Sequence, residues 1–106
     1  MKHDQLEKMV KGWFVGAFQP SAFTTDACEV GLKRYRAGDS EVAHYHDIAT
    51  EITLIVSGKV RMLNKTWLEG DIITISPGES TSFEALTEAV TVVVKVPGAL
   101  DDKFFM

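Results

Sequence analysis

The sequence lacks the features that would assign it to a disulfide-stabilised or membrane class. It has one cysteine, Cys28, so no intrachain disulfide can form, and a packed small residue explains it better than a nucleophile. No apolar run approaches the length of a membrane span, and the charged amino-terminal segment differs from a secretory signal. We therefore expect a cytoplasmic location and no membrane partner.

Blocks of positive charge are also absent. The formal net charge is −4 at pH 7, and no lysine or arginine cluster with interleaved aromatic residues occurs. We therefore expect no nucleic-acid partner. At 106 residues, with 45% hydrophobic residues, 25% charged residues and no internal repeat, the chain has the size of one domain, residues 1–106.

What the sequence does contain is a regular series of short β-prone segments. They recur about every ten residues, at 28–36, 52–56, 59–63, 72–75, 82–86 and 89–96. Glycine, proline, asparagine and serine stand between them, and a helical period is almost absent. This rhythm predicts an all-β protein, an antiparallel barrel or sandwich made from two sheets.

One constellation carries most of the chemical information. His44 and His46 lie two positions apart, Glu51 follows five positions later, and Gly38 and Gly58 flank the run. On an extended strand the two histidines share a face. Two imidazoles and one carboxylate suit Fe, Mn, Ni or Zn better than Ca or Mg. The spacing therefore predicts a divalent transition-metal site made by His44, His46 and Glu51.

The same run resembles the first signature of the cupin superfamily, in which a glycine, His-x-His, a glutamate and a second glycine stand at these intervals. Residues 70–81 resemble the second signature in their two glycines and their length. The resemblance implies an antiparallel jelly-roll-like cupin barrel that forms a homodimer. The metal would lie inside that barrel.

The second signature departs from the family pattern at its polar positions. Ser76 stands in place of the usual proline, Thr81 in place of the third metal-binding histidine, and Ala85 in place of an asparagine. A hydroxyl is a poor neutral ligand, so three protein ligands remain and metal affinity should fall.

Strand parity extends the set of side chains expected to line the barrel. Thr53 shares a face with Glu51, Phe83 shares one with Thr81, and Met62 belongs to a third inward face. The apolar face of residues 28–32 continues to Arg34, whose guanidinium would bind a carboxylate or phosphate there, or would instead pair with an acid in solvent. Lys95 either faces solvent or lies opposite Glu51. The expected ligand-binding residues are Arg34, Thr53, Met62, Thr81 and Phe83.

Three functions remain open at this stage. The first is binding of a small polar or anionic molecule beside the metal, with metal-dependent oxygenase, isomerase or lyase activity as its enzymatic form. The second is a non-enzymatic binding or sensing module without metal. The third is a metal-free sugar isomerase or epimerase, as one branch of the cupins implies, with a histidine–carboxylate base and a tyrosine acid. Parity turns both Tyr35 and Tyr45 outward, away from such a site.

Overall fold

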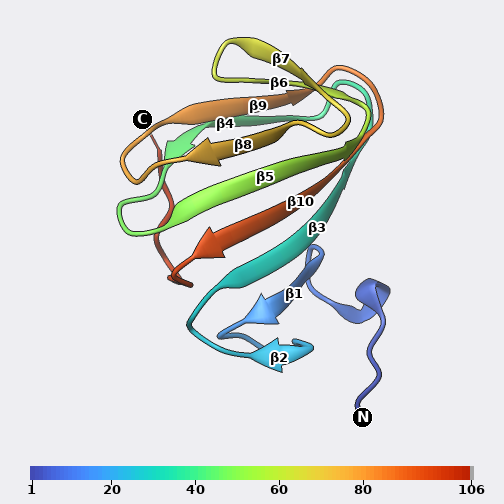
Figure 1. Cartoon of the computed structure of the whole chain (residues 1–106), viewed down its shortest axis with the longest axis vertical. Coiled ribbons are helices and arrows are strands. Elements are labelled where there is room, and N and C mark those ends of the chain that lie inside the picture. The colour runs from blue at the N-terminus through green and yellow to red at the C-terminus, as the bar shows by residue number, and fades with distance from the viewer. Residues whose placement is uncertain (106) are drawn as a thin grey trace.

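The computed structural model describes residues 1–105, which form two β-sheets facing each other (Figure 1). The six-stranded sheet has the order β2-β1-β3-β10-β5-β8, and the five-stranded sheet has the order β11-β4-β9-β6-β7. In chain order the strands are β1 Trp13–Gly16, β2 Phe23–Thr24, β3 Glu29–Tyr35, β4 Ser40–Tyr45, β5 Thr50–Ser57, β6 Lys59–Met62, β7 Lys65–Leu68, β8 Ile72–Ile75, β9 Thr81–Ala85, β10 Ala89–Val96 and β11 Phe104–Phe105.

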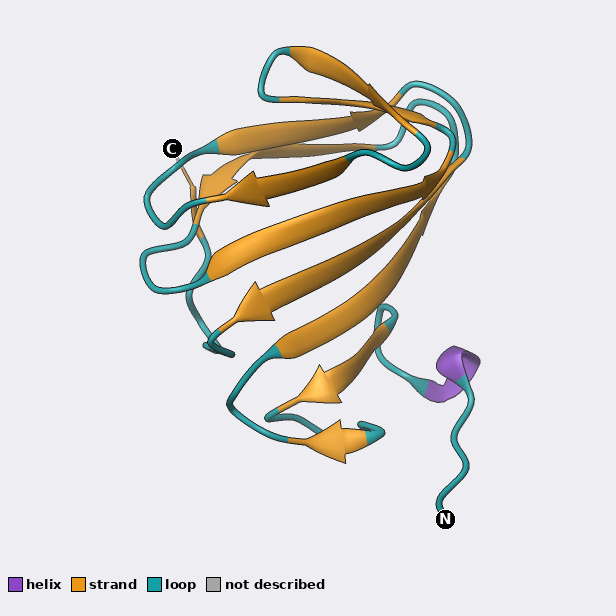
Figure 2. Cartoon of the chain, viewed as in Figure 1, coloured by secondary structure: helices purple, strands orange, loops and turns teal. Residues whose placement is uncertain are grey.

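The architecture confirms the predicted all-β, jelly-roll-like barrel. Neighbouring strands are antiparallel except β1 and β2, which run parallel. Within residues 1–105 the helical content is a single 3₁₀ turn, η1 Leu6–Lys8 (Figure 2). No helix among these residues is both long and apolar enough to cross a bilayer.

The core lies between the two sheets where they approach each other. Strands β5, β8 and β10 supply one wall and β6 and β9 the other, because every second side chain of each strand points inward. Full burial of one aliphatic side chain stabilises the fold by about 1.5–3 kcal/mol. The buried cluster consists of Ile55, Val60, Met62, Ile73, Ile75, Phe83, Ala85 and Ala89.

Gly58, the last residue of the first motif, makes the turn between β5 and β6. Its φ is +87°, and a Cβ at this position would lie 2.1 Å from the carbonyl oxygen of Glu88. Glycine is required there both for the left-handed backbone and for the close approach of the chain before β10. The motif glycine is therefore explained by the geometry of the fold at this turn.

The carboxyl-terminal segment folds back onto its own chain. Strand β11 pairs with β4 in the register Phe104 with Tyr45 and Phe105 with His44. The rings of Tyr45 and Phe104 stack with centroids 5.5 Å apart. Strand β11 is thereby held beside the strand that carries His44 and leads to His46.

Candidate metal centre and binding cavity

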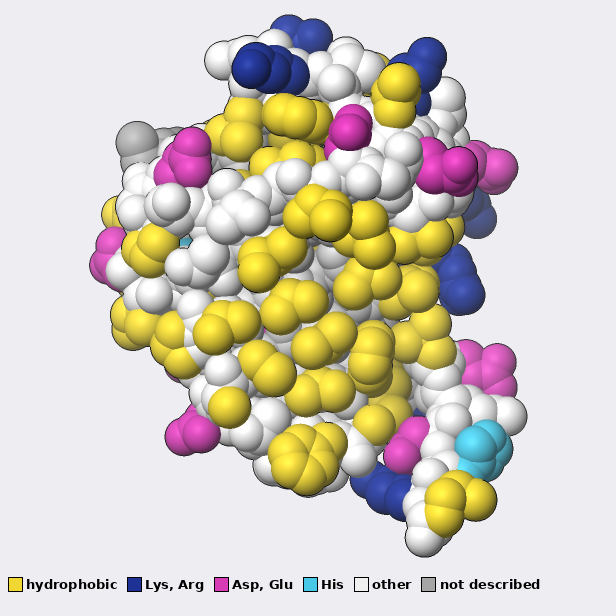
Figure 3. Space-filling view, viewed as in Figure 1, with side chains coloured by type: hydrophobic (Ala, Val, Ile, Leu, Met, Phe, Trp, Pro, Cys, Tyr) yellow, Lys and Arg dark blue, Asp and Glu magenta, His cyan; other side chains and the backbone are white. Residues whose placement is uncertain are grey.

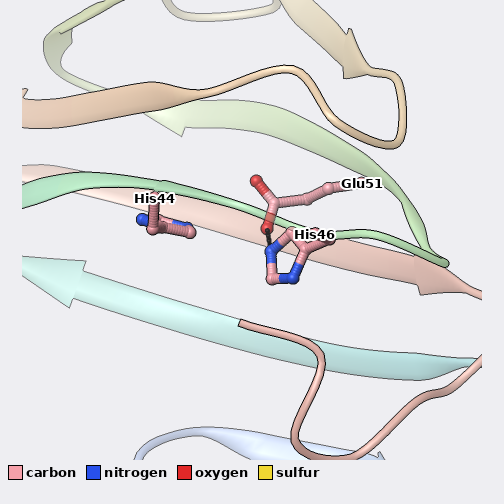
Figure 4. A group of neighbouring side chains, drawn as sticks. All are labelled: His44, His46 and Glu51. Atoms are coloured by element: carbon pink, nitrogen blue, oxygen red, sulfur yellow. Dashed lines mark ion pairs between the residues drawn. The ribbon is translucent and has the colours of Figure 1, made fainter. Parts of the chain in front are cut away.

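Strand β4 and the start of β5 bring the predicted metal ligands together (Figure 4). His44 is 8% exposed and His46 5% exposed, and their ring centroids are 5.4 Å apart at an interplanar angle of 79°. One ligand atom from each of His44, His46 and Glu51 lies within 4.8 Å of the others. The three side chains converge as their spacing predicted.

Backbone carbonyls orient both imidazoles. Nδ1 of His46 donates to the carbonyl oxygen of Asp102 at 2.5 Å, and Nδ1 of His44 donates to that of Val42 at 3.3 Å. A carbonyl can only accept, so in both rings the proton is on Nδ1. Nε2 of each neutral imidazole then carries a free lone pair, which is the form that binds a metal.

The donor set fits a divalent transition metal. Nε2 of His46 is buried and makes no hydrogen bond, although Oε1 of Glu51 is 3.4 Å away. A buried polar atom without a partner is costly, and a metal bonded to nitrogen and oxygen at about 2.0–2.2 Å would supply one. Small movements of the three side chains would bring these atoms within range of a single ion.

In the absence of metal, the three side chains shift one another's pKa values. The Glu51 carboxylate raises the pKa of His46, and desolvation only partly opposes it. Burial acts to raise the pKa of Glu51, but His46 outweighs it, so that this pKa is lowered. Burial lowers the pKa of His44. Without metal, Glu51 therefore favours a second proton on His46, whereas burial favours the neutral form of His44.

Asp102 holds the loop between the two histidines and Glu51. Its carboxylate accepts hydrogen bonds from the backbone N–H groups of Asp47, Ile48 and Ala49 at 3.0–3.2 Å. Burial acts to raise the pKa of Asp102, but these donors lower it below its usual value. Sequence reasoning missed this residue, because no local pattern links it to a loop more than fifty positions earlier.

A cavity of about 340 Å³ opens beside the three ligands. Thr53, Met62, Thr81 and Phe83, four of the five predicted ligand-binding residues, line it together with His44 and Glu51. Contact between these residues and a ligand stays a prediction.

Thr81 lies directly opposite His44 across the β4–β9 pair, as expected for the position of a third ligand. Its hydroxyl donates to the carbonyl of Ser82 and accepts from the N–H of Leu63. The hydroxyl is therefore occupied by backbone groups, and the metal set is limited to three side chains.

The predicted orientations of Arg34 and Tyr35 are wrong. Arg34 is exposed on the outer face of β3 and does not line this cavity, whereas Tyr35 does. The error came from taking the apolar face of β3 as its inner face. The inner face is the polar one, because it borders the cavity, and it carries Lys33 and Tyr35.

The cations of the cavity are lysines. Lys11, Lys33, Lys95 and Lys103 line it, against two carboxylates, Glu41 and Glu51. Lys95 lies directly opposite Glu51 across the β5–β10 pair, so of the two predicted orientations the inward one is correct. Lys33 was missed because the wrong face of β3 was taken as the inner one; strand alternation from Tyr35 on the cavity side leads directly to it.

Neither a protein-family model nor a curated protein sequence matches this chain. Solved structures do match. A protein with a double-stranded β-helix domain from Klebsiella pneumoniae superposes with a TM-score of 0.66 and 20% identity, over 70% of this chain and 66% of that one. The DMSP lyase DddQ from Ruegeria pomeroyi superposes with a TM-score of 0.70 and 18% identity, over 89% of this chain and 49% of that one.

A third neighbour is a protein from Silicibacter pomeroyi that is described as a sugar phosphate isomerase from a cupin superfamily. It superposes with a TM-score of 0.62 and 22% identity, over 66% of this chain and 50% of that one. The aligned part makes up less than two thirds of each of the three structures. At these identities the likeness concerns the fold. The chain has the double-stranded β-helix fold of the cupin superfamily, as its first motif suggested.

Proposed function

We propose that this chain binds a small polar or anionic molecule in its cavity, beside a divalent transition metal (Fe, Mn, Ni or Zn) held by His44, His46 and Glu51. The observation that carries the proposal is the buried, unpartnered Nε2 of His46, which faces Glu51 while Nδ1 is fixed by a carbonyl. A ring held in this way is prepared to bind metal through Nε2.

The metal would act as a Lewis acid on an oxygen of the bound molecule. The chain's own residues contribute orientation and exclusion of water. Carbonyls of Val42 and Asp102 hold the two imidazoles, and Met62 and Phe83 form apolar parts of the wall near them. Three protein ligands leave coordination positions for the molecule.

The structural neighbours support a small-molecule ligand. Two of them are named as a DMSP lyase and a sugar phosphate isomerase, and both names describe proteins that act on small molecules. The cavity volume of about 340 Å³ lies at the lower end of the range for ligand sites, about 300–1,000 Å³. A metabolite-sized ligand fits this space better than a polymer.

A metal-free sugar isomerase or epimerase is the second candidate, and one observation favours it. Tyr35 lines the cavity, and its hydroxyl donates to Glu41 at 3.3 Å, so a tyrosine acid is available after all. Burial raises the pKa of this hydroxyl, and Glu41 adds to the effect. His46, the histidine paired with a carboxylate, does not line the cavity, which argues against it as the base.

Metal titration tests the first proposal. Untagged, chelator-treated protein is titrated with Mn, Ni and Zn by calorimetry, and with Fe under anaerobic conditions. We expect one site per chain and at least about a tenfold loss of affinity in His44→Ala and His46→Ala. His3→Ala removes an exposed histidine outside the site and serves as the control.

The two metal-free functions, an isomerase or epimerase and a binding or sensing module, predict other results. If the protein bound none of the four metals, one of these functions would be favoured. Turnover of sugar phosphates by metal-free protein, lost in Tyr35→Phe, would select the isomerase. Stabilisation of the metal-free protein by a small molecule, without turnover, would select the binding or sensing module.

We also propose that the chain forms a homodimer through the outer face of the six-stranded sheet. Hydrophobic side chains gather there in a broad band over β8, β5, β10 and β3 (Figure 3). Ile72 is 65% exposed and Val56 40% exposed, and their partly buried neighbours on this face are Val30, Leu32, Ile52, Leu54, Val92 and Val94.

The size and chemistry of this face suit a second copy of the chain. Strands β3, β5, β8 and β10 contain 7, 8, 4 and 8 residues. At about 3.3 Å per residue and about 4.8 Å between strands they cover roughly 430 Å² per protomer, so a symmetric pair would bury about 900 Å², close to the lower limit of about 1,000 Å² for a stable interface. A hydrophobic face without charge at its centre can pair with a second copy of itself in a symmetric dimer.

The oligomeric state tests this interface. Light scattering should give a dimer for the unmodified protein and a monomer for Leu54→Glu and Val92→Glu, which place charge on two directly paired positions. Val42→Glu, at an exposed position of the other sheet, is the control. A monomer at all concentrations, or a dimer that survives both substitutions, would contradict the proposal.

A further inference from the structure

The cavity contains an aromatic surface that the metal site does not use. Trp13 of β1 pairs with Gly31 of β3, and its ring lies over this glycine. A Cβ at Gly31 would come within 2.7 Å of the ring, so only glycine allows the ring to pack so closely. Trp13 therefore forms part of the cavity wall next to the inner face of β3 and β10.

Two lysines lie over this ring. Nζ of Lys33 is 4.6 Å from the ring centroid and Nζ of Lys95 is 4.9 Å from it. Both distances are within the range of cation–π attraction, which favours the ammonium groups at this place. Repulsion between the two charges opposes it.

In the described part of the chain, these ammonium groups lack a close carboxylate partner. Among residues 1–105, neither lysine has a carboxylate oxygen within 4.0 Å. Glu41 acts on Lys33 from a distance and raises its pKa, but the Glu41 carboxylate accepts a hydrogen bond from Tyr35, and Glu51 is paired with His46. Nζ of Lys33 itself donates to the carbonyl of Lys11 at 2.7 Å, so its charge is compensated only in part.

Their surroundings make this incomplete compensation costly. Both side chains are partly buried, and desolvation by burial lowers the pKa of Lys33; Glu41 opposes this effect and Lys95 adds to it. Partly desolvated like charges side by side are stabilised by an anion placed between them. The chain as a whole carries a net charge of −4, so this concentration of lysines is local to the cavity.

A buried hydroxyl lies beside Lys33 in the same cavity. Thr91 is 1% exposed, lines the cavity and is the direct cross-strand partner of Lys33. Its Oγ1 is buried and makes no hydrogen bond of good geometry, although it is near enough to the Tyr35 hydroxyl to act on the pKa of that group. Buried hydroxyls are normally satisfied, so a shift of Tyr35, a ligand atom or an ordered water would complete this one.

We propose that Lys33 and Lys95, above Trp13 and beside Thr91, form an anion subsite for a carboxylate or phosphate group of the cavity ligand. The subsite deepens the function proposed above, because a ligand bound here by its anionic end would reach the metal ligands with its other end. Lys95 lies opposite Glu51 on the neighbouring strand, so the two sites are adjacent. The ligand class is a small organic anion with a second polar group.

The test uses metal-free protein, so that it does not depend on the metal site. Calorimetric titrations with inorganic phosphate and with malonate are carried out at constant ionic strength, with malonamide as the uncharged analogue. We expect saturable binding of at least one of the two anions and none of malonamide. Lys33→Met and Lys95→Met should each weaken binding by about tenfold or more.

The controls separate a subsite from a general charge effect. Lys59→Met removes an exposed lysine outside the cavity and should leave the affinity unchanged. Lys95→Arg keeps the charge and should retain most of the binding. Without ligand, Lys33→Met and Lys95→Met should melt at or above the temperature of the unmodified protein, because each removes one of two partly buried like charges that lie over the same ring.

Three results would overturn the proposal: no saturable binding of either anion, equal binding of malonamide, or an equal loss in Lys59→Met. The metal proposal is tested independently of the anion subsite. If the metal proposal is correct, Lys33→Met and Lys95→Met bind metal with unchanged stoichiometry. If the metal proposal is wrong, the metal-free protein still binds the anion.

Discussion

The backbone carbonyl of Asp102 accepts a hydrogen bond from Nδ1 of His46, which lies 56 positions earlier in the sequence. The same residue's carboxylate binds three consecutive N–H groups of the loop that leads to Glu51. One residue near the carboxyl terminus therefore fixes both the ring of one candidate metal ligand and the approach to another.

The first prediction concerns stability. Asp102→Asn replaces a charged acceptor by an amide whose NH₂ group faces backbone donors, so we expect a loss of about 2 kcal/mol in the free energy of unfolding. Urea denaturation measures it. Asp101→Asn, at the exposed neighbouring position, should change the free energy little, and equal effects of the two substitutions would contradict the assigned role.

The second prediction is the pH dependence of that contribution. The pKa of Asp102 is lowered in the folded protein from its ordinary value of 3.8, so its stabilisation is fully present above that value. It is lost as the pH falls through the lower, folded-state pKa. The stability difference between the unmodified protein and Asp102→Asn should stay constant from neutral pH to about pH 5 and shrink below about pH 4. A constant difference down to pH 2 would show that another group is responsible.

The third prediction links metal binding to a proton. Glu51 raises the pKa of His46 above 6.5, so near neutral pH a part of the metal-free protein carries a proton that the metal must displace. The pKa of His44 is lowered, and this ring gives up no proton. Calorimetry in buffers of different ionisation enthalpy should detect net proton release that grows, with falling affinity, as the pH drops toward 6.5. Binding without proton release across this interval would argue against His46 as a ligand.

The fourth prediction tests the packing of Trp13 on Gly31. Gly31→Ala places a methyl group against the indole ring, and we expect it to cost about 1–3 kcal/mol and to change the tryptophan fluorescence. In a Trp13→Ala background the added methyl group meets no ring, so the cost should largely disappear. A double-mutant cycle measures this coupling. An equal cost in both backgrounds would mean that the strand itself rejects alanine.

The sequence predicted the fold and the three converging ligands because both depend on local patterns. The β-prone segments between turn residues became β3, β5, β6, β8, β9 and β10. The His-x-His spacing placed two imidazoles on one face, and Glu51 began the next strand as expected. Period-two alternation and turn chemistry are properties that a single sequence contains.

The orientation of β3 could not be predicted in the same way. Its apolar residues face outward, onto the surface proposed as a dimer interface, and its polar residues Lys33 and Tyr35 face the cavity. Alternation tells which residues share a face but not which face is inside. The contacts of Asp102 and β11 depend on the fold bringing distant segments together, and no local signal reports them.

X-ray absorption spectroscopy of the metal-loaded protein tests the central claim most directly. For Zn- or Ni-loaded, untagged protein, the account predicts about one ion per chain, bound by two imidazole nitrogens and by oxygen ligands that include Glu51. His46→Ala should remove one imidazole from the spectrum, and His3→Ala should remove none. A spectrum without imidazole scattering, or one that His46→Ala leaves unchanged, would contradict the account.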